Sequence, residues 1–170
     1  HHGLTFSRPD VAVIGNDFVD IGFHRARSVL VGENERNFYQ YPQMLHFASE
    51  ALGMHLRLMN CDVVLGGGNR ITRGANLDWL QGYEEVFCAF DYDAGGLQMF
   101  STIAASLGDK ATFVQPPDWQ PWLGRFRNTP DTTERFTRAI SLAEGLGFVP
   151  LAEAFRATGK FMEQEMILDE

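Results

Sequence analysis

The chain has 170 residues, of which 45% are hydrophobic, and its formal net charge at pH 7 is −8. A chain of this size can bury the core of one domain, and no apolar run approaches the roughly 18 residues of a membrane-spanning helix. The negative charge argues against a module that grips nucleic acid by charge alone, although acids that bind cations add to such a charge. The first residues, His1-His2-Gly3, resemble the remnant of a purification tag, so we expect a domain excised from a longer protein.

The segment 4–28 is predicted to be a β-rich N-terminal extension. Residues 11–14 (VAVI) have the composition of a short strand, Gly15-Asn16-Asp17 is typical of a turn, and a second strand is expected over residues 19–23. We therefore expect a hairpin in front of the main domain.

Strands and helices alternate from residue 28 to residue 146, and the strands are short, continuous and apolar. Such strands are typical of a parallel sheet that is covered on both faces. The sequence predicts an α/β domain over residues 29–170, with a mostly parallel four-stranded sheet flanked by helices. The predicted strands are 28–31, 62–65, 86–90 and 111–114; the predicted helices are 37–52 with a break near Pro42, 71–80, 97–107, 129–145, 150–157 and 160–168. The proline-rich residues 115–122 are predicted to form a loop.

Three acids follow two of the predicted strands. Glu33 comes directly after the first strand, and Asp91 and Asp93 come directly after the third. The carboxyl ends of parallel strands meet at one edge of a sheet, so these side chains converge if the two strands are neighbours. Carboxylates held together need a proton or a cation, and Mg²⁺ or Mn²⁺ is the simplest cation with oxygen ligands. The alternatives are a solvated loop acid for Glu33 and a turn or helix N-cap for the two aspartates.

Further candidate contacts are glycines, arginines and a C-terminal acid. Gly66-Gly67-Gly68 lacks the lysine of a nucleotide P-loop, which leaves a tight turn or an anion nest. Glu165 could reach the site from the predicted last helix, or it could be a solvated acid. The arginines cluster as Arg70 with Arg73, and as Arg125 with Arg127, Arg135 and Arg138; each cluster is either solvated surface or a phosphate contact.

Cysteine and histidine offer no competing chemistry. Cys61 and Cys88 lie in or beside apolar strands and do not form a C-x-x-C pair, so we expect two buried, reduced thiols and a cytoplasmic origin. The histidines show no metal-ligand spacing.

Four segments in order resemble the toprim-like C-terminal domain of JetD, the nuclease subunit of Wadjet plasmid-defence systems. Toprim domains at large, including that of the topoisomerase VI A subunit, share the lone glutamate and the D-x-D pair. The segments are 31–38 (VGENERNF) for V-E-N-x-x-x-F, 64–69 (VLGGGN) with 79–80 (WL) for apolar-G-x-G-Y and a later W-L, 91–96 (DYDAGG) for G-D-I-D-x-x-G, and 162–165 (MEQE) for R-L-E-Q-E.

The resemblance implies a toprim-like catalytic domain that cuts DNA with Mg²⁺ or Mn²⁺. It carries over Glu33, Asp91 and Asp93 as metal ligands and catalytic residues, with Glu165 as a fourth and Glu163 as the competing choice. Asn34 would orient Glu33 or contact substrate. The phosphate contacts expected beside these acids are Arg36, Gly67, Gly68 and Arg70.

The partners that the resemblance implies are plasmid double-stranded DNA and condensin-like SMC complex subunits, with a second copy of this chain as a further candidate and no membrane. Three alternatives stay open. One is a non-catalytic toprim-like module kept for assembly of a DNA-processing complex. Another is a haloacid-dehalogenase-like phosphatase with Asp91 as nucleophile, and the third is a D-x-D glycosyltransferase.

Overall fold

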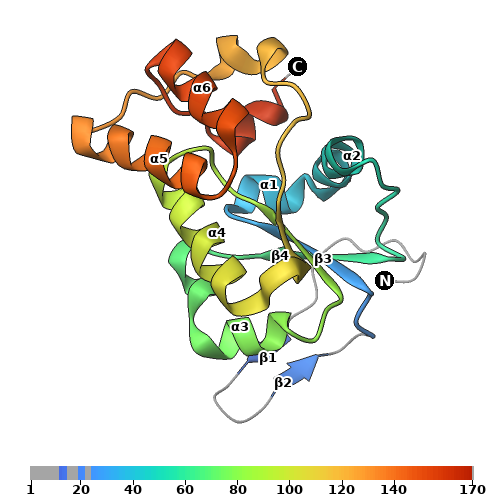
Figure 1. Cartoon of the computed structure of the whole chain (residues 1–170). Helices are drawn as coiled ribbons and strands as arrows, with labels where there is room; N and C mark the ends of the chain where they lie inside the picture. The colour runs from blue at the N-terminus through green and yellow to red at the C-terminus, as the bar shows by residue number, and fades with distance from the viewer. Residues whose placement is uncertain (1–11, 15–18, 22–23, 170) are drawn as a thin grey trace.

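The computed structural model describes residues 12–14, 19–21 and 24–169 (Figure 1). Its centre is a four-stranded sheet in which every neighbouring pair is parallel, in the order β4-β3-β5-β6. The strands are β3 (Ser28–Gly32), β4 (Cys61–Leu65), β5 (Glu85–Ala89) and β6 (Ala111–Phe113). The predicted α/β class and parallel four-stranded sheet are therefore confirmed, and β3 and β5, the strands that precede Glu33 and Asp91, are neighbours.

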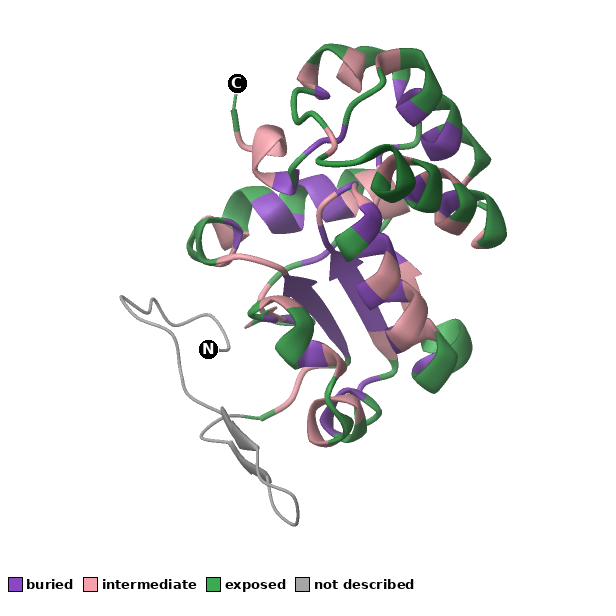
Figure 2. Cartoon of the chain, turned by 90° about the vertical axis from the view of Figure 1, so that its left-hand side faces the viewer, coloured by how far each residue is buried: buried purple, intermediate pink, exposed green. Residues whose placement is uncertain are grey.

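Helices cover both faces of this sheet because successive strand residues point to opposite sides. Val29 and Val31 of β3 pack with α3 (Gly74–Leu80) and α4 (Ala94–Leu107). Leu30, between them, packs instead with α2 (Tyr41–Leu52). The two central strands, β3 and β5, are buried almost throughout (Figure 2), whereas β4 and β6 are partly exposed. Burial on both faces explains why the central strands are largely apolar in the sequence.

A second layer of helices lies outside α4. α5 (Thr133–Gly145) packs on α4, and α6 (Val149–Thr158) packs on α5 (Figure 1). The predicted break near Pro42 is confirmed, because α1 (Glu35–Tyr39) ends before α2 begins with the proline in its first turn. The remaining elements are the short 3₁₀ helices η1 (Gly68–Thr72), η2 (Gly108–Lys110), η3 (Gln120–Arg125) and η4 (Gln164–Ile167).

The predicted hairpin in the N-terminal extension is present as backbone: β1 (Ala12–Ile14) pairs antiparallel with β2 (Val19–Ile21). Its expected turn at residues 15–17, like the expected tag remnant at 1–3, lies outside the described residues.

Several predicted elements need correction. The helix predicted over 71–80 is divided at Arg73 into η1 and α3, and α4 begins at Ala94 rather than at 97. The helix predicted over 160–168 is wrong: α6 ends at Gly159, whose φ is +66°, and Phe161 and Met162 then pair as isolated bridges before η4 begins. α5 begins at Thr133 rather than at 129, because the Thr132 side chain accepts from the Arg135 N–H and caps the helix there. The loop predicted over 115–122 gives way at Gln120 to η3, whose first turn accommodates Pro121.

Candidate functional site

Glu33 and Asp91 meet at the carboxyl edge of the sheet. Gly32 and Ala89 are partners in the parallel register of β3 and β5, so the residues that follow each strand leave the sheet side by side. The Glu33 carboxylate Oε2 accepts a hydrogen bond from the Asp91 N–H at 2.8 Å. The structure thus brings together two of the acids that the sequence placed at one rim.

Burial and nearby negative charges raise the pKa of both acids. Burial raises the pKa of Glu33, the hydrogen bond from the Asp91 N–H opposes this, and the charge of Asp93 adds to it. The pKa of Asp91 rises to about 7, chiefly through burial and then through the charge of Glu33. The Gln164 N–H offsets part of that rise, whereas Asp93 and Glu163 add to it. A site of this kind favours a bound proton or a cation.

Asp93 lies at the same edge, but both of its carboxylate oxygens are occupied. Its Oδ1 accepts from the Gly96 N–H at 2.8 Å, which makes Asp93 the N-cap of α4. Its Oδ2 pairs with the Arg135 guanidinium at 3.3 Å. The helix can turn this tightly only because residue 96 is glycine: a Cβ there would overlap the Asp91 carbonyl oxygen. The N-cap alternative therefore describes how Asp93 is held in this structure.

The C-terminal segment returns to this edge and holds Asp91. The Tyr92 N–H donates to the Met162 carbonyl at 2.9 Å, and the Met162 N–H donates back at 3.3 Å. Two residues further on, the Gln164 N–H donates to Asp91 Oδ1 at 2.7 Å. Glu33 and Asp91 are therefore each oriented by a backbone N–H from another segment.

The two C-terminal acids behave differently. Glu163 lies close enough to Asp91 to raise its pKa, and the Asn128 side chain donates to Glu163 at 2.7 Å. Glu165 forms an ion pair with Arg36 at 3.2 Å. Glu163 is thus the C-terminal acid that is coupled electrostatically to Asp91.

The predicted phosphate contacts lie around this edge in different states. Asn34 caps α1 by accepting from the Asn37 N–H at 2.9 Å. Arg36 is engaged by Glu165 and, at 2.6 Å, by Asp169. Gly67 and Gly68 have φ of +64° and +65°, and the Gly68 N–H points at the Glu33 carbonyl oxygen at 3.4 Å. Arg70 is exposed on η1.

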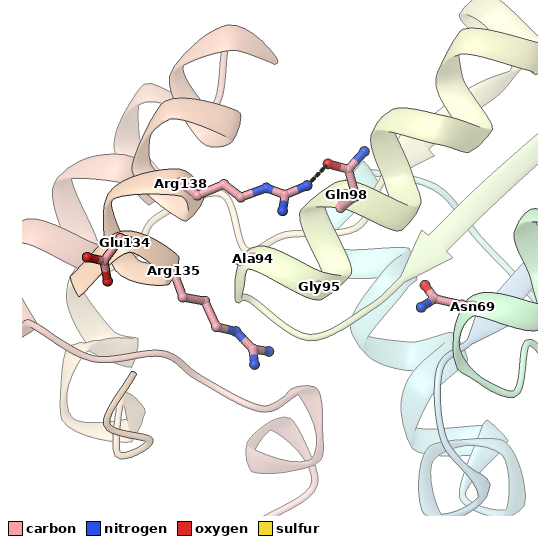
Figure 3. Close-up of a pocket in the computed structure, with 7 residues that line it drawn as sticks. All are labelled: Asn69, Ala94, Gly95, Gln98, Glu134, Arg135 and Arg138. Atoms are coloured by element: carbon pink, nitrogen blue, oxygen red, sulfur yellow. Dashed lines mark hydrogen bonds between the residues drawn. The ribbon is translucent and has the colours of Figure 1, made fainter. Parts of the chain in front are cut away.

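A cavity of about 460 Å³ lies next to Asp93, between α4 and α5. Figure 3 shows the guanidinium groups of Arg135 and Arg138 extending from α5 towards α4, whereas the Glu134 carboxylate points away from α4. The lining residues are Asn69, Ala94, Gly95, Gln98, Glu134, Arg135 and Arg138. A smaller cavity of about 120 Å³ lies on the other side of Arg135, against Asp93, Asn128 and Asp131.

Three residues that shape the site carried little or no signal in the sequence. Arg135 was one of a cluster of arginines, with nothing to tie it to Asp93. Gln164 acts through its backbone N–H, which any residue except proline supplies. Asn37 is buried beside Gly32 without a hydrogen-bond partner for its amide among the described residues; a polar residue on an apolar helix face was the available signal.

The acids at this edge leave few donor oxygens free for a cation. Among the residues that the structure describes, no group of three or more histidine, cysteine, aspartate or glutamate side chains is arranged to hold a metal ion. This agrees with the engagement of both Asp93 oxygens. Glu33 and Asp91, however, each keep one oxygen without a hydrogen bond to a described residue. Mg²⁺ is commonly bound through one or two carboxylates, with water and phosphate oxygens completing its shell.

In residues 24–169, no helix has the length and hydropathy of a membrane-spanning segment. No protein-family model, no curated protein and no solved structure matches the chain.

Proposed function

We propose that this chain is a Mg²⁺- or Mn²⁺-dependent endonuclease domain that hydrolyses phosphodiester bonds in DNA. The observation that carries the proposal is the Glu33–Asp91 pair: two half-buried acids that follow neighbouring strands, joined through the Asp91 N–H at 2.8 Å, each with a raised pKa and one oxygen free of described partners. Such a pair is stabilised by a bound proton or a cation, and groups with perturbed pKa values of this kind often belong to functional sites.

In this proposal Glu33 and Asp91 hold the cation, and two backbone N–H groups keep their carboxylates in place. A bound divalent cation would place positive charge beside the phosphate oxygens. It would also lower the pKa of a water molecule bound to it towards neutrality. Asp91 must lose its proton before it can serve as a ligand. Because its pKa is about 7, cation binding should strengthen as the pH rises through neutrality. Asp93 becomes available when Arg135 releases its Oδ2.

The wider role that we propose is plasmid defence in the cytoplasm, with double-stranded DNA as substrate and condensin-like SMC subunits as partners. Its support is the resemblance of four sequence segments in order to the toprim-like domain of JetD. The two cysteines, both buried and free, are compatible with a reducing compartment.

The test of the catalytic proposal is cleavage of circular plasmid DNA in Mn²⁺ by the Asp91→Asn variant. Asparagine keeps the acceptor for the Gln164 N–H but removes the charge, so the cleavage rate should fall by about 100-fold or more. The matched control is Asp109→Asn, since Asp109 is an exposed aspartate of η2. Undiminished cutting by Asp91→Asn, or an equal loss in Asp109→Asn, contradicts the assignment.

A non-catalytic assembly module is the second candidate. It is favoured by the engagement of both Asp93 carboxylate oxygens with Gly96 and Arg135. Titration calorimetry separates the two. The nuclease proposal expects Mn²⁺ binding that is lost in Glu33→Gln, whereas the absence of Mn²⁺ binding to the unmodified chain at pH 8 supports the module.

A further inference from the structure

The cavity between α4 and α5 carries an inference that rests on the proposed nuclease function. We propose that it binds a backbone phosphate of the DNA strand next to the phosphate that is cut. Arg138 is the principal contact, and Arg135 links this cavity to Asp93. The substrate contact would therefore come from α5, an element outside the four segments of the resemblance.

The charges in the cavity support an anionic ligand. Among the described residues, no acid lies within ion-pair distance of Arg138; its guanidinium instead donates to the neutral Gln98 side chain at 2.6 Å. Its positive charge is therefore left for a ligand. Arg135 is held between Asp93 at 3.3 Å and Asp131 at 3.1 Å. A phosphate is a better bidentate partner for a guanidinium than an amide oxygen is.

Position and size favour a nucleic-acid strand over a free anion. The cavity adjoins the first turn of α4, directly after Asp93, so a strand that reaches the acids has its next phosphate nearby. Its volume of about 460 Å³ is that of a pocket for an organic ligand rather than for a lone phosphate. The amides of Asn69 and Gln98, which also line the cavity (Figure 3), offer neutral hydrogen-bond partners for a sugar–phosphate chain.

The experiment measures binding of a fluorescein-labelled DNA duplex in EDTA at several salt concentrations. Without metal, binding reports the phosphate contacts and is independent of cleavage. Arg138→Gln should weaken binding several-fold and reduce the slope of log affinity against log salt by about one, the signature of one lost phosphate contact. Arg138→Lys should restore the slope, because lysine keeps the charge. The control is Arg156→Gln, since Arg156 of α6 is paired with Glu144; it should match the unmodified chain.

An unchanged salt slope in Arg138→Gln overturns the proposal, and so does an equal change in Arg156→Gln. Displacement of the duplex by millimolar inorganic phosphate also overturns it, because the site would then take the free anion. These results are separate from the nuclease assignment: if Asp91→Asn still cuts plasmid while Arg138→Gln loses one unit of slope, the catalytic assignment fails and the phosphate contact stands.

Discussion

A proton and a divalent cation compete for the carboxylate of Asp91. Its partial burial beside Glu33 raises its pKa to about 7, so Asp91 holds a proton at a higher pH than an exposed aspartate does. A divalent cation competes with that proton for the same oxygen. A cation can therefore bind this oxygen only by displacing the proton.

The free energy of unfolding of the metal-free protein should depend on pH through Asp91. Between about pH 4 and pH 7 the folded chain keeps a proton on Asp91 that the unfolded chain has lost, so the free energy of unfolding should fall as pH rises through this window. Above pH 7 this contribution is fully lost. Asp91→Asn should remove most of the slope and be more stable than the unmodified chain at pH 8 by about 2–4 kcal/mol.

Urea unfolding in EDTA at pH 5 and pH 8 measures both chains. Asp109→Asn serves as the control, because Asp109 is exposed, and it should follow the unmodified chain. Parallel pH profiles for Asp91→Asn and the unmodified chain would mean that Asp91 is ionised in the fold at an ordinary pKa.

Whether a site residue could be predicted from the sequence depends on which of its groups acts in the site. Glu33 and Asp91 could be predicted because each side chain is chemically distinctive and follows an apolar strand. The pairing of Asp93 with Arg135 could not, because it joins two helices whose packing depends on the whole domain. The Gln164 contact could not either, because the group that acts is a backbone N–H.

At the scale of the element, the first turn of α4 is fixed by one glycine. In Gly96→Ala the added methyl group would overlap the Asp91 carbonyl, which is backbone and cannot move aside cheaply. We expect a loss of about 1–3 kcal/mol of stability, and weaker Mn²⁺ binding because Asp91 is displaced. The matched control is Gly145→Ala in α5: nothing lies within 4 Å of its Cβ position, so stability should rise by up to about 1 kcal/mol.

Thermal unfolding and Mn²⁺ titration of the two alanine variants check this prediction. If Gly96→Ala is as stable as the unmodified chain and binds Mn²⁺ equally, the close approach of α4 to Asp91 is not a requirement of the site.

Element prediction succeeded where the local pattern and the tertiary structure agree. β3 and β5 are apolar after their first residues, Ser28 and Glu85, because alternate residues enter the two helix layers on either side of the sheet. The helix predicted for the last segment is wrong because local pattern and tertiary structure disagree there. Residues 160–168 have helical spacing, but the backbone of Phe161 and Met162 pairs with Asn128 and Tyr92. Hydrogen bonds to segments distant in sequence outweighed local propensity there.

At the scale of the molecule, cation binding should be visible as added stability, since a ligand that binds only the folded state stabilises it. With Mn²⁺ at 100 times its dissociation constant the gain is about 2.7 kcal/mol. The shift in melting temperature should be larger at pH 8 than at pH 5, because protons compete at Asp91. Glu33→Gln should lose the shift and Asp109→Asn should keep it. A shift that is equal at both pH values, or one retained by Glu33→Gln, places the cation elsewhere.

The tie between Asp91 and the Gln164 N–H spans 73 positions of the chain. During synthesis, a ribosome that has released residues up to 150 has already delivered both aspartates and Glu33, but not the segment that orients Asp91. The acid cluster can therefore assume its final arrangement only in the last stage of translation of this region, after the sheet and α4 have had time to form.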